Sequence, residues 1–347
     1  MKVVVDVMGS DKGPEQIIKG ALLGARREEV DLVLVGDRKK ITAVLGHQSA
    51  ESSEVTIEDS NKIVPMGEKV SLGLLRDKDS SLSIALKLVK EERAEVVVSA
   101  GNTAAFVGLA IRQLGFLPGV DRPAIGILLP TPRGFCIFLD VGATVDPSPH
   151  NLLQYAVMGN LCSQILLKKE NPTLGLLNIG EEETKGSSLT KETYRLLSSS
   201  FPNFKGNIEG QDIFSGDIDV IITDGFVGNV VLKACEGMAD LIRKMVKDSF
   251  SSYPFGRLGA VLNRNLFQEL EKKVSYAEYG GGMLLGVNGI AIVSHGRSPA
   301  SAIANAVKVG KEAATAKIVP RLAEAIEKLE YKTHEKSGNC RHRFLSP

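Results

Sequence analysis

Asn229 and Lys233 are the two side chains whose types and spacing most directly suggest chemistry. They stand four residues apart where we predict a helix after a turn at Asp224–Asn229, so both can lie on one helical face. Gly225 and Gly228 in that turn would let the backbone approach a ligand closely. A helix N-terminus attracts anions and opposes a nearby cation, so Lys233 is easier to explain if an anion binds beside it. Alone, the segment predicts a site for a nucleotide, a carboxylate or a phosphate.

The elements that would hold this segment repeat along the chain. A short run of Val, Ile and Leu, a polar turn with glycine and then an amphipathic helix recur, which predicts a mostly parallel sheet covered by helices. We expect one α/β catalytic unit over residues 1–330, and a disordered tail over residues 331–347 because that stretch is polar and basic. The predicted strands are residues 3–7, 32–35, 96–99, 135–139, 174–177, 220–223 and 290–293.

Polar residues beside glycine follow six of these strands. Ligands of open α/β sheets bind outside the carboxyl ends of the strands, so we predict that these loops share one cleft. Any single loop could instead need its glycine and Asn or Asp only for a turn or a helix cap. A histidine at a strand end, such as His295, is as often structural as catalytic. The other residues concerned include Gly101, Asn102, Thr103, Asp140, Asn178, Gly180 and Lys185.

Two segments interrupt the repeating pattern. Residues 67–82 are polar and basic, with Arg76 and Lys78, and form either a surface loop or an anion-binding lid. Residues 250–270 are apolar at roughly helical spacing and carry few acidic residues. We interpret this second segment as a core or dimer-interface helix, or as an interfacial helix resting on anionic lipid. Its candidate membrane contacts are Leu258, Val261, Leu262 and Leu266.

Composition and missing motifs exclude several classes of function. A formal charge of +1 on 347 residues gives no electrostatic case for nucleic acid. The four cysteines are far apart, which fits a reducing cytosol and argues against structural zinc. No signal peptide or membrane span is evident. The dinucleotide, P-loop, serine-elbow and zinc signatures are all missing, so we expect no cofactor, no metal and no covalent nucleophile.

Nine strings distributed along the chain carry a resemblance. DVMGSDKGP, LLRDKDSSL, SAGNTAA, DRPAIG, LDVGATVD, LLNIGEEETKG, TDGFVGNVVLKACEG, YGGGMLLGV and SHGRS resemble, in this order, the phosphate acyltransferase family of bacterial phospholipid synthesis. Its members are also called acyl-acyl carrier protein:phosphate transacylases. The resemblance covers roughly residues 1–317. Ser10 and Arg297 depart from the expected pattern, as do Ala104-Ala105 and Gly282-Met283, and these changes affect loop geometry more than the assignment.

The resemblance implies a three-layer fold like that of isocitrate dehydrogenase and phosphotransacetylase, a homodimer, and a cytoplasmic enzyme that associates peripherally with the membrane. It implies transfer of a long-chain acyl group from acyl carrier protein to inorganic phosphate. The acyl phosphate would then pass to a membrane acyltransferase. Phosphate is itself the nucleophile, so the site needs cations and N–H donors to hold two negative charges close together.

The resemblance also suggests roles for individual residues. Lys185, Lys233 and Asn229 would stabilise phosphate and the developing oxyanion, and His295 would donate to the leaving sulfur. Asp140 or Asp224 could orient a lysine, or Asp140 could be a turn cap. Arg76 and Lys78 could recruit phosphate or the acidic carrier protein. The full set of phosphate- or substrate-binding candidates is Gly101, Asn102, Thr103, Asp140, Asn178, Gly180, Asp224, Gly225, Gly228, Arg76 and Lys78.

Three other functions stay open on the sequence alone. A short-chain phosphotransacetylase that uses coenzyme A would have the same sheet, although the apolar 250–270 segment favours a longer acyl group. A metal-dependent decarboxylating dehydrogenase would need clustered aspartates and an arginine-rich carboxylate site, which we do not find. A non-catalytic scaffold on a lipid surface would leave the polar strand ends unexplained.

Overall fold

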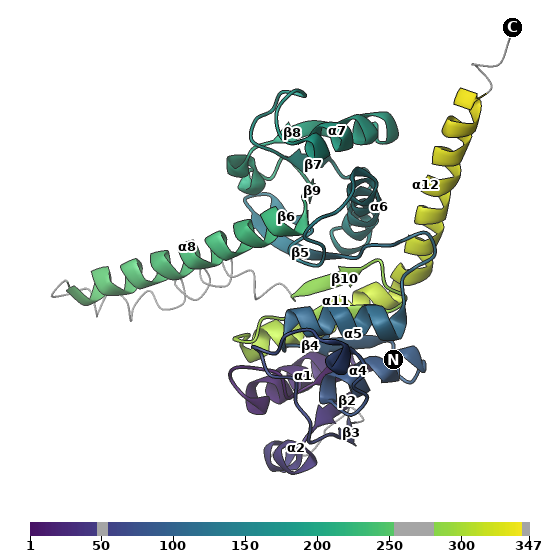
Figure 1. Ribbon diagram of the computed structural model, residues 1–347. Coiled ribbons are helices and arrows are strands. Elements are labelled where there is room, and N and C mark those ends of the chain that lie inside the picture. Colours follow the sequence, from purple (N-terminus) through teal and green to yellow (C-terminus); the bar gives the residue numbers. More distant parts are fainter. Residues whose placement is uncertain (47–54, 253–280, 342–347) are drawn as a thin grey trace, which may run out of the picture.

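The computed structural model describes residues 1–46, 55–252 and 281–341. Within these residues the chain forms one 11-stranded sheet with helices on both faces (Figure 1), which confirms the predicted three-layer, mostly parallel α/β fold. The strands are β1 Lys2–Asp6, β2 Asp31–Gly36, β3 Val55–Asp59, β4 Val96–Ser99, β5 Ala124–Thr131, β6 Gly134–Leu139, β7 Leu174–Leu177, β8 Phe204–Ile208, β9 Val220–Ile222, β10 Gly282–Leu285 and β11 Ile290–Val293.

Helices connect most of these strands, as the alternating pattern predicts. They are α1 Pro14–Glu28, α2 Arg38–Leu45, α3 Leu72–Leu75, α4 Ser81–Lys90, α5 Thr103–Leu114, α6 Pro149–Leu166, α7 Ser188–Ser200, the 3-10 helix η1 Gly210–Phe214, α8 Gly225–Ser252, α11 Ala300–Thr315 and α12 Ile318–Arg341.

The sheet consists of two parallel halves that run in opposite directions. Its order is β3-β2-β1-β4-β11-β10-β5-β6-β9-β7-β8. The first five strands of this order are mutually parallel, as are the last four, and β10 and β5 between them pair antiparallel with their neighbours. The carboxyl ends of the strands in one half therefore lie beside the amino ends of the strands in the other half. The six polar strand ends, from which we predicted a single cleft, form two groups of loops. Another element must connect these two groups.

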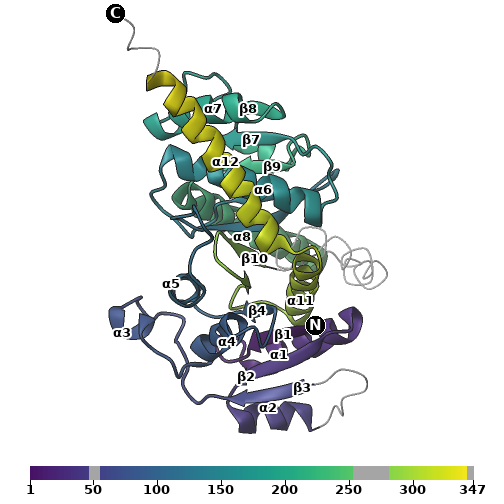
Figure 2. The same ribbon diagram turned by 90° about the vertical axis from the view of Figure 1, so that its right-hand side faces the viewer.

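Two cores hold the helices to the sheet, one on each face. The first lies beneath α1, α6, α11 and α12, and Figure 2 shows α12 along the same side of the molecule as α6. The second lies beneath α4 and α5 and includes the partly buried Val231 and Leu232 of α8. Strand residues alternate between the two cores, as in Val3 and Val4 of β1, because successive side chains of a strand point to opposite faces.

The observed boundaries differ from the sequence prediction at two helices. We predicted a turn over Asp224–Asn229, but α8 already begins at Gly225 because the Asp224 carboxylate caps its first turn. We expected a disordered tail from residue 331, whereas α12 continues to Arg341. Its first half is anchored by buried side chains, including Leu322 and Ile326, from which helix can propagate at low cost.

Candidate active site

Helix α8 connects the two groups of loops. It begins directly after β9, which belongs to the half of the sheet formed by β6, β9, β7 and β8, and it extends outward from the molecule (Figure 1). Three turns along it, the Glu236 carboxylate lies 3.9 Å from Nε2 of His295, which follows β11 in the other half. One turn before, Nζ of Lys233 donates to both Glu236 oxygens, at 2.9 and 3.2 Å. The helix thus brings Lys233 and Glu236 to His295.

The His295 side chain is one-third exposed and held by its own loop. Its Nδ1 accepts the backbone N–H of Arg297 at 3.1 Å, which leaves the proton of a neutral imidazole on Nε2, the atom that faces Glu236. Burial lowers the pKa of His295, and the positive charges of Lys233 and Arg297 add to this effect, while Glu236 and Asp11 oppose it. The imidazole is therefore neutral at pH 7 and presents an N–H donor toward Lys233 and Glu236.

The loop after β1 hydrogen-bonds to the His295 loop, and the loop after β4 packs against the loop after β1. Ser10 donates its hydroxyl to the carbonyl of Gly296 at 2.8 Å, and the Asp11 N–H donates to the same carbonyl at 3.0 Å. The loops after β1 and β4 are packed so tightly that a Cβ at Gly9 would lie 2.6 Å from Cα of Gly101. Glycine at position 9 is therefore needed for contact between the two loops, whereas a Cβ at Gly101 would lie 3.4 Å from Cα of Gly9.

Asn102 connects this group of loops to the segment before α3. Its side-chain oxygen accepts the N–H of Ala105 and caps α5, and its amide nitrogen donates to the carbonyls of Pro65, Met66 and Glu68 at 2.9–3.2 Å. Both ends of the amide are thus occupied within the protein. Thr103 is the exposed first residue of α5. In this geometry Asn102 positions a loop, and its predicted direct contact with phosphate stays untested.

Asp140 organises the other group of loops, after β6. Its buried carboxylate accepts the backbone N–H groups of Ile125, Gly142, Ala143 and Thr144 at 2.7–3.0 Å. Burial raises the pKa of Asp140 to about 6, while these four hydrogen bonds act in the opposite direction. The contacts fit the turn-cap alternative that the sequence left open for this residue. The role of Asp140 in orienting a lysine stays a prediction.

The first turn of α8 packs directly on the Asp140 turn. A Cβ at Gly228 would lie 1.8 Å from the Asp140 carbonyl oxygen, and one at Gly225 would lie 2.5 Å from the Thr144 carbonyl oxygen. Both glycines therefore allow helix and turn to touch, and the ligand approach that we predicted for them stays a prediction. The exposed Asn229 follows, with its side chain against Gly142.

The remaining predicted residues lie apart from this cluster of contacts. Lys185 follows β7, and its exposed ammonium lies 3.9 Å from Glu182, while Asn178 donates to the Lys185 carbonyl. Gly180 lies within the same loop. Arg76 and Lys78 are exposed near α3. The predicted membrane contacts Leu258, Val261, Leu262 and Leu266 fall outside the described residues.

Comparison with known proteins decides the family. A family model described as "Fatty acid synthesis protein" matches residues 1–321. A phosphate acyltransferase of Thermodesulfovibrio yellowstonii is 42% identical over 345 residues, covering 99% of each chain. One from Desulfitobacterium hafniense is 45% identical over 313 residues, covering 90% of this chain and 93% of the relative. The chain belongs to the phosphate acyltransferase family. The resemblance of the nine strings is thereby confirmed, and the protein is an acyltransferase.

Solved structures show how this phosphate acyltransferase resembles other proteins in fold. A phosphotransacetylase from Streptococcus pyogenes matches with a TM-score of 0.59 at 16% identity, covering 94% of each chain. A branched-chain phosphotransacylase from Enterococcus faecalis matches with a TM-score of 0.55 at 13% identity, covering 90% of this chain and 98% of the other. At such identities the likeness concerns the fold alone. Among the described residues, no helix combines the length and apolar character needed to cross a membrane.

Two further residues of this phosphate acyltransferase lie at the candidate site, and neither was predicted from the sequence. Glu236 contacts both Lys233 and His295, and its i+3 spacing from Lys233 on a predicted helix could have indicated it. Ser294 is 3% exposed, and its hydroxyl has no hydrogen-bond partner among the described residues. No sequence pattern marks an unsatisfied hydroxyl, because it depends on which groups the fold packs around it.

Proposed function

We propose that this enzyme transfers a long-chain acyl group from acyl-acyl carrier protein to inorganic phosphate, giving acyl phosphate for phospholipid synthesis. The observation that most supports this proposal is the position of Lys233, where α8 meets His295. The Lys233 ammonium and the neutral Nε2–H of His295 then both face the region around Glu236. An anionic nucleophile and a developing oxyanion require donors of this kind. Family membership supports the transfer to phosphate. The carrier-protein donor and the role in phospholipid synthesis are our extension.

Phosphate itself can be the attacking group. A phosphate oxygen forms a bond to the thioester carbon, and the carbon–sulfur bond breaks to release a thiolate. A thiol has a pKa near ~8.5, so this leaving group needs little protonation. His295, neutral at pH 7, stabilises the departing sulfur by hydrogen bonding from Nε2 and need not transfer its proton. Lys233 has three N–H donors and, within residues 1–46, 55–252 and 281–341, contacts one carboxylate, which leaves capacity for phosphate.

Protein thiols are poor candidates for an acyl-enzyme intermediate in the described residues. Burial raises the pKa of Cys136 and of Cys162 to about 12, and it also raises that of the half-buried Cys235. A thiol attacks as its thiolate, which is scarce at pH 7 when the pKa is raised. Direct attack by phosphate is therefore the simpler route.

Trapping of the product tests the proposal. Purified enzyme with palmitoyl-acyl carrier protein should consume the thioester only when phosphate is added, and hydroxylamine should trap palmitoyl hydroxamate. Acetyl-coenzyme A in parallel tests the short-chain alternative. Faster phosphate-dependent turnover of acetyl-coenzyme A would favour that alternative. Consumption of palmitoyl thioester without phosphate would refute transfer to phosphate.

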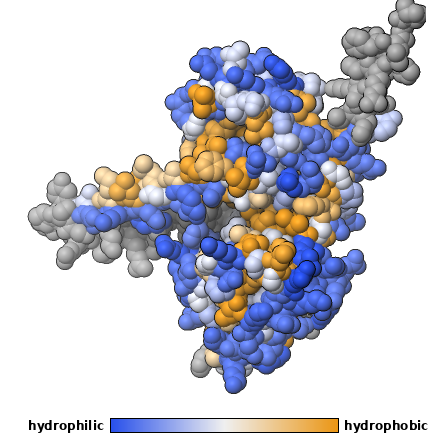
Figure 3. Space-filling model, viewed as in Figure 1, coloured by the Kyte–Doolittle hydropathy of each residue, from blue (hydrophilic) through white to orange (hydrophobic). Residues whose placement is uncertain are grey.

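We further propose that the enzyme is a homodimer that pairs through α8. Six apolar side chains of α8 follow one another at intervals of four and three residues, which is the spacing of helices that pack in pairs. They are Val227, Val231, Ala234, Met238, Leu241 and Met245. Met238, Leu241 and Met245 are 50–59% exposed. In Figure 3 apolar side chains gather along one side of this projecting helix. A second copy of the chain would cover them.

Peripheral contact with an anionic membrane is the last part of the proposal. It rests on the amphipathic sequence of residues 250–270. Aspartate in place of Leu258 and Leu262 should release the enzyme from vesicles that contain anionic lipid, while thermal unfolding stays unchanged. Vesicle binding that survives the substitution of both Leu258 and Leu262 would contradict the membrane contact.

The exposed Arg76 and Lys78 would attract phosphate or the acidic carrier protein.

A further inference from the structure

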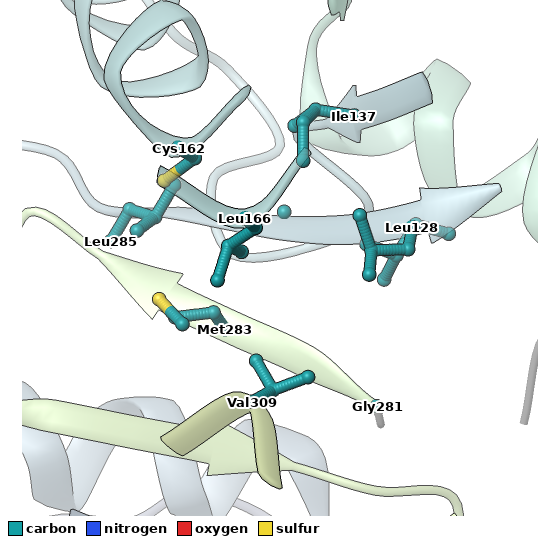
Figure 4. Close-up of a pocket in the computed structure, with 10 residues that line it drawn as sticks. Leu128, Ile137, Cys162, Leu166, Gly281, Met283, Leu285 and Val309 are labelled. Carbon is teal, nitrogen blue, oxygen red and sulfur yellow. The ribbon is translucent and has the colours of Figure 1, made fainter. Parts of the chain in front are cut away.

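Close packing at the centre of the sheet leaves little room for a substrate there. The hollow between α6, α11, β5 and β10 is lined by apolar side chains such as Leu128, Leu166 and Met283 (Figure 4). Its volume is about 20 Å³, which holds about one water molecule. Neither phosphate nor an acyl chain fits into this hollow. The geometry of the site therefore has to be set at the strand ends, where the loop of His295 and its neighbours lie.

A buried carboxylate lies beneath the loops of the first half of the sheet. Asp6 ends β1 and is 2% exposed. Burial raises the pKa of its carboxyl group, while hydrogen bonds from Ser81, Ser99 and Met8 oppose this effect. Among residues 1–46, 55–252 and 281–341, no cation pairs with this carboxylate. Burial of a carboxylate without a cation costs free energy, which its hydrogen bonds must offset.

The two oxygens of Asp6 hold different loops. Oδ1 accepts the backbone N–H of Met8 at 3.2 Å, in the loop after β1. Oδ2 accepts the hydroxyl of Ser99, the last residue of β4, at 2.8 Å. Oγ of Ser99 in turn accepts the Gly101 N–H at 3.2 Å, in the loop after β4. A Cβ at Gly9 would lie 2.6 Å from Cα of Gly101 and 3.6 Å from Oδ2 of Asp6, so the carboxylate lies under the contact between the two loops.

The same two strand ends hold the segment that carries His295. At the end of β4, the Ser99 carbonyl accepts the Ser294 N–H at 2.8 Å. In the loop after β1, Ser10 donates its hydroxyl to the Gly296 carbonyl at 2.8 Å. His295 is thus held through the residue on each side of it, and both contacts lead back to the buried carboxylate.

We propose that Asp6 is a positioning residue of the acyl transfer, because it holds the two strand ends that keep the His295 imidazole within 3.9 Å of Glu236. This inference rests on the proposed function and deepens it, since it says what fixes the donor at the site. An asparagine would not suffice, because one end of its amide is itself a donor. Either the Met8 N–H or the Ser99 hydroxyl would then lose its acceptor.

A matched pair of serine substitutions tests this role. Ser99→Ala removes the hydroxyl that links β4 to Asp6. Ser83→Ala removes a similarly buried hydroxyl in the same half, which donates to the Asp77 carbonyl at 2.7 Å. We expect Ser99→Ala and Asp6→Asn each to lower kcat/KM for phosphate-dependent transfer at least tenfold. Ser83→Ala should keep kcat/KM within twofold, although both serine variants should lower the melting temperature.

Coupling to His295 distinguishes positioning from a general loss of stability. If Asp6 acts through the His295 loop, Asp6→Asn and His295→Gln remove the same contribution, so Asp6→Asn should lower kcat/KM less than threefold in the His295→Gln background. Ser10→Ala removes the other contact to that loop at a partly exposed position. It should show the same non-additivity, even if Asp6→Asn fails to fold. Equal losses in both backgrounds for the folded variants would overturn the proposal.

A measurement without substrate separates this inference from the proposed function. NMR titration, assigned with His295→Gln, gives the pKa of His295, which burial holds below its ordinary value of 6.5. Ser99→Ala changes no charge, so this pKa should rise toward 6.5 as the loop opens to solvent, and Ser83→Ala should leave it unchanged. An unchanged pKa in Ser99→Ala would overturn the role of Asp6 and leave the transfer to phosphate intact. If wild-type enzyme transfers nothing to phosphate but the pKa rises, the proposed function fails and the placement of His295 by Asp6 remains.

Discussion

At the scale of single residues, the candidate site depends on one cation that is already paired. The Lys233 ammonium donates to Glu236, whose side chain is only 19% exposed and also approaches His295. In the proposed function, the carboxylate would hold the ammonium near the imidazole until phosphate binds, and phosphate would then share the ammonium. Glu236 would thus be a positioning residue, and Lys233 would contact the substrate.

Replacement of Lys233 should affect the transition state more than the fold. We expect Lys233→Ala to lower kcat about 100- to 1,000-fold, the usual cost of losing one donor to a developing oxyanion. Lys185→Ala and Asn229→Ala should raise the phosphate KM if those residues bind phosphate. Lys244→Ala, an exposed lysine farther along α8, is the matched control and should behave like wild type. Near wild-type turnover and phosphate KM in all three site variants would refute these roles.

The pH dependence of the His295 contribution follows from its lowered pKa. Below pH 6.5 the His295 imidazole of the unfolded chain becomes increasingly protonated. Burial keeps the same imidazole neutral to lower pH in the folded protein. The neutral donor is therefore the majority form of the folded protein from pH 8 down to 6.5. The ratio of wild-type to His295→Gln kcat/KM should fall by less than twofold across that range. A ratio that rises as the pH falls toward 6.5 would show that the imidazolium ion acts as an acid.

At the scale of elements, the start of α8 fixes the position of the site. The first turn of the helix touches the Asp140 turn without any intervening side chain, so the direction of the helix is set at its origin. Three turns later that direction determines whether Glu236 reaches His295. A small displacement at Gly228 would therefore be amplified at Lys233.

Two glycines of α8 provide a matched pair of substitutions. Gly228→Ala should lower the free energy of unfolding by about 1–3 kcal/mol, since the new methyl group meets a backbone oxygen that cannot easily move. It should also lower kcat by tilting the helix. Gly237→Ala faces open space in the same helix and should stabilise by about 0.5–1 kcal/mol. Chemical denaturation measures both values, and equal stabilities of the two variants would contradict close contact at Gly228.

Sequence reasoning recovered the elements whose patterns are local. The runs at 96–99, 174–177 and 290–293 match β4, β7 and β11 residue for residue. Strands β3, β5, β8 and β10 were not predicted. Among them, β10 lies within a glycine-rich stretch that lacks strong strand propensity and depends on pairing with β5 and β11. The reversal of strand direction between the two halves of the sheet could not be predicted either, because the strand–helix alternation that indicates parallel neighbours is the same in both halves.

The candidate site could be predicted only in part, because only some of its residues are related by a local sequence pattern. Lys233 and Asn229 were found from spacing along one helix, which is a local property. The meeting of Glu236 and His295 joins residues from opposite halves of the sheet, and only the path of α8 brings them together. Contact between helix and turn is one cause of the glycines at positions 225 and 228, and the ligand approach predicted for them stays a prediction. Sequence alone cannot separate those two causes, since both require a missing side chain.

At the scale of the whole molecule, the projecting helix α8 should determine assembly. Leu241→Glu with Met245→Glu places two charges in the exposed apolar row, and we expect the protein to sediment as a monomer at micromolar concentration. Arg243→Glu changes charge on the opposite side of the same helix and should leave the dimer intact. A dimer that persists in the double variant would show that α8 is not the interface.

The placement of β10 and β11 also constrains how the chain is made. β4 has β1 on one side and β11 on the other, and β5 has β6 and β10, yet β10 and β11 come near the end of the sequence. During synthesis, both β4 and β5 therefore wait with one unpaired edge while most of the remaining chain emerges. Such edges pair readily with other strands, so the nascent protein depends on late insertion of one hairpin. Chains that stop before residue 281 should aggregate, although each parallel half is present in large part.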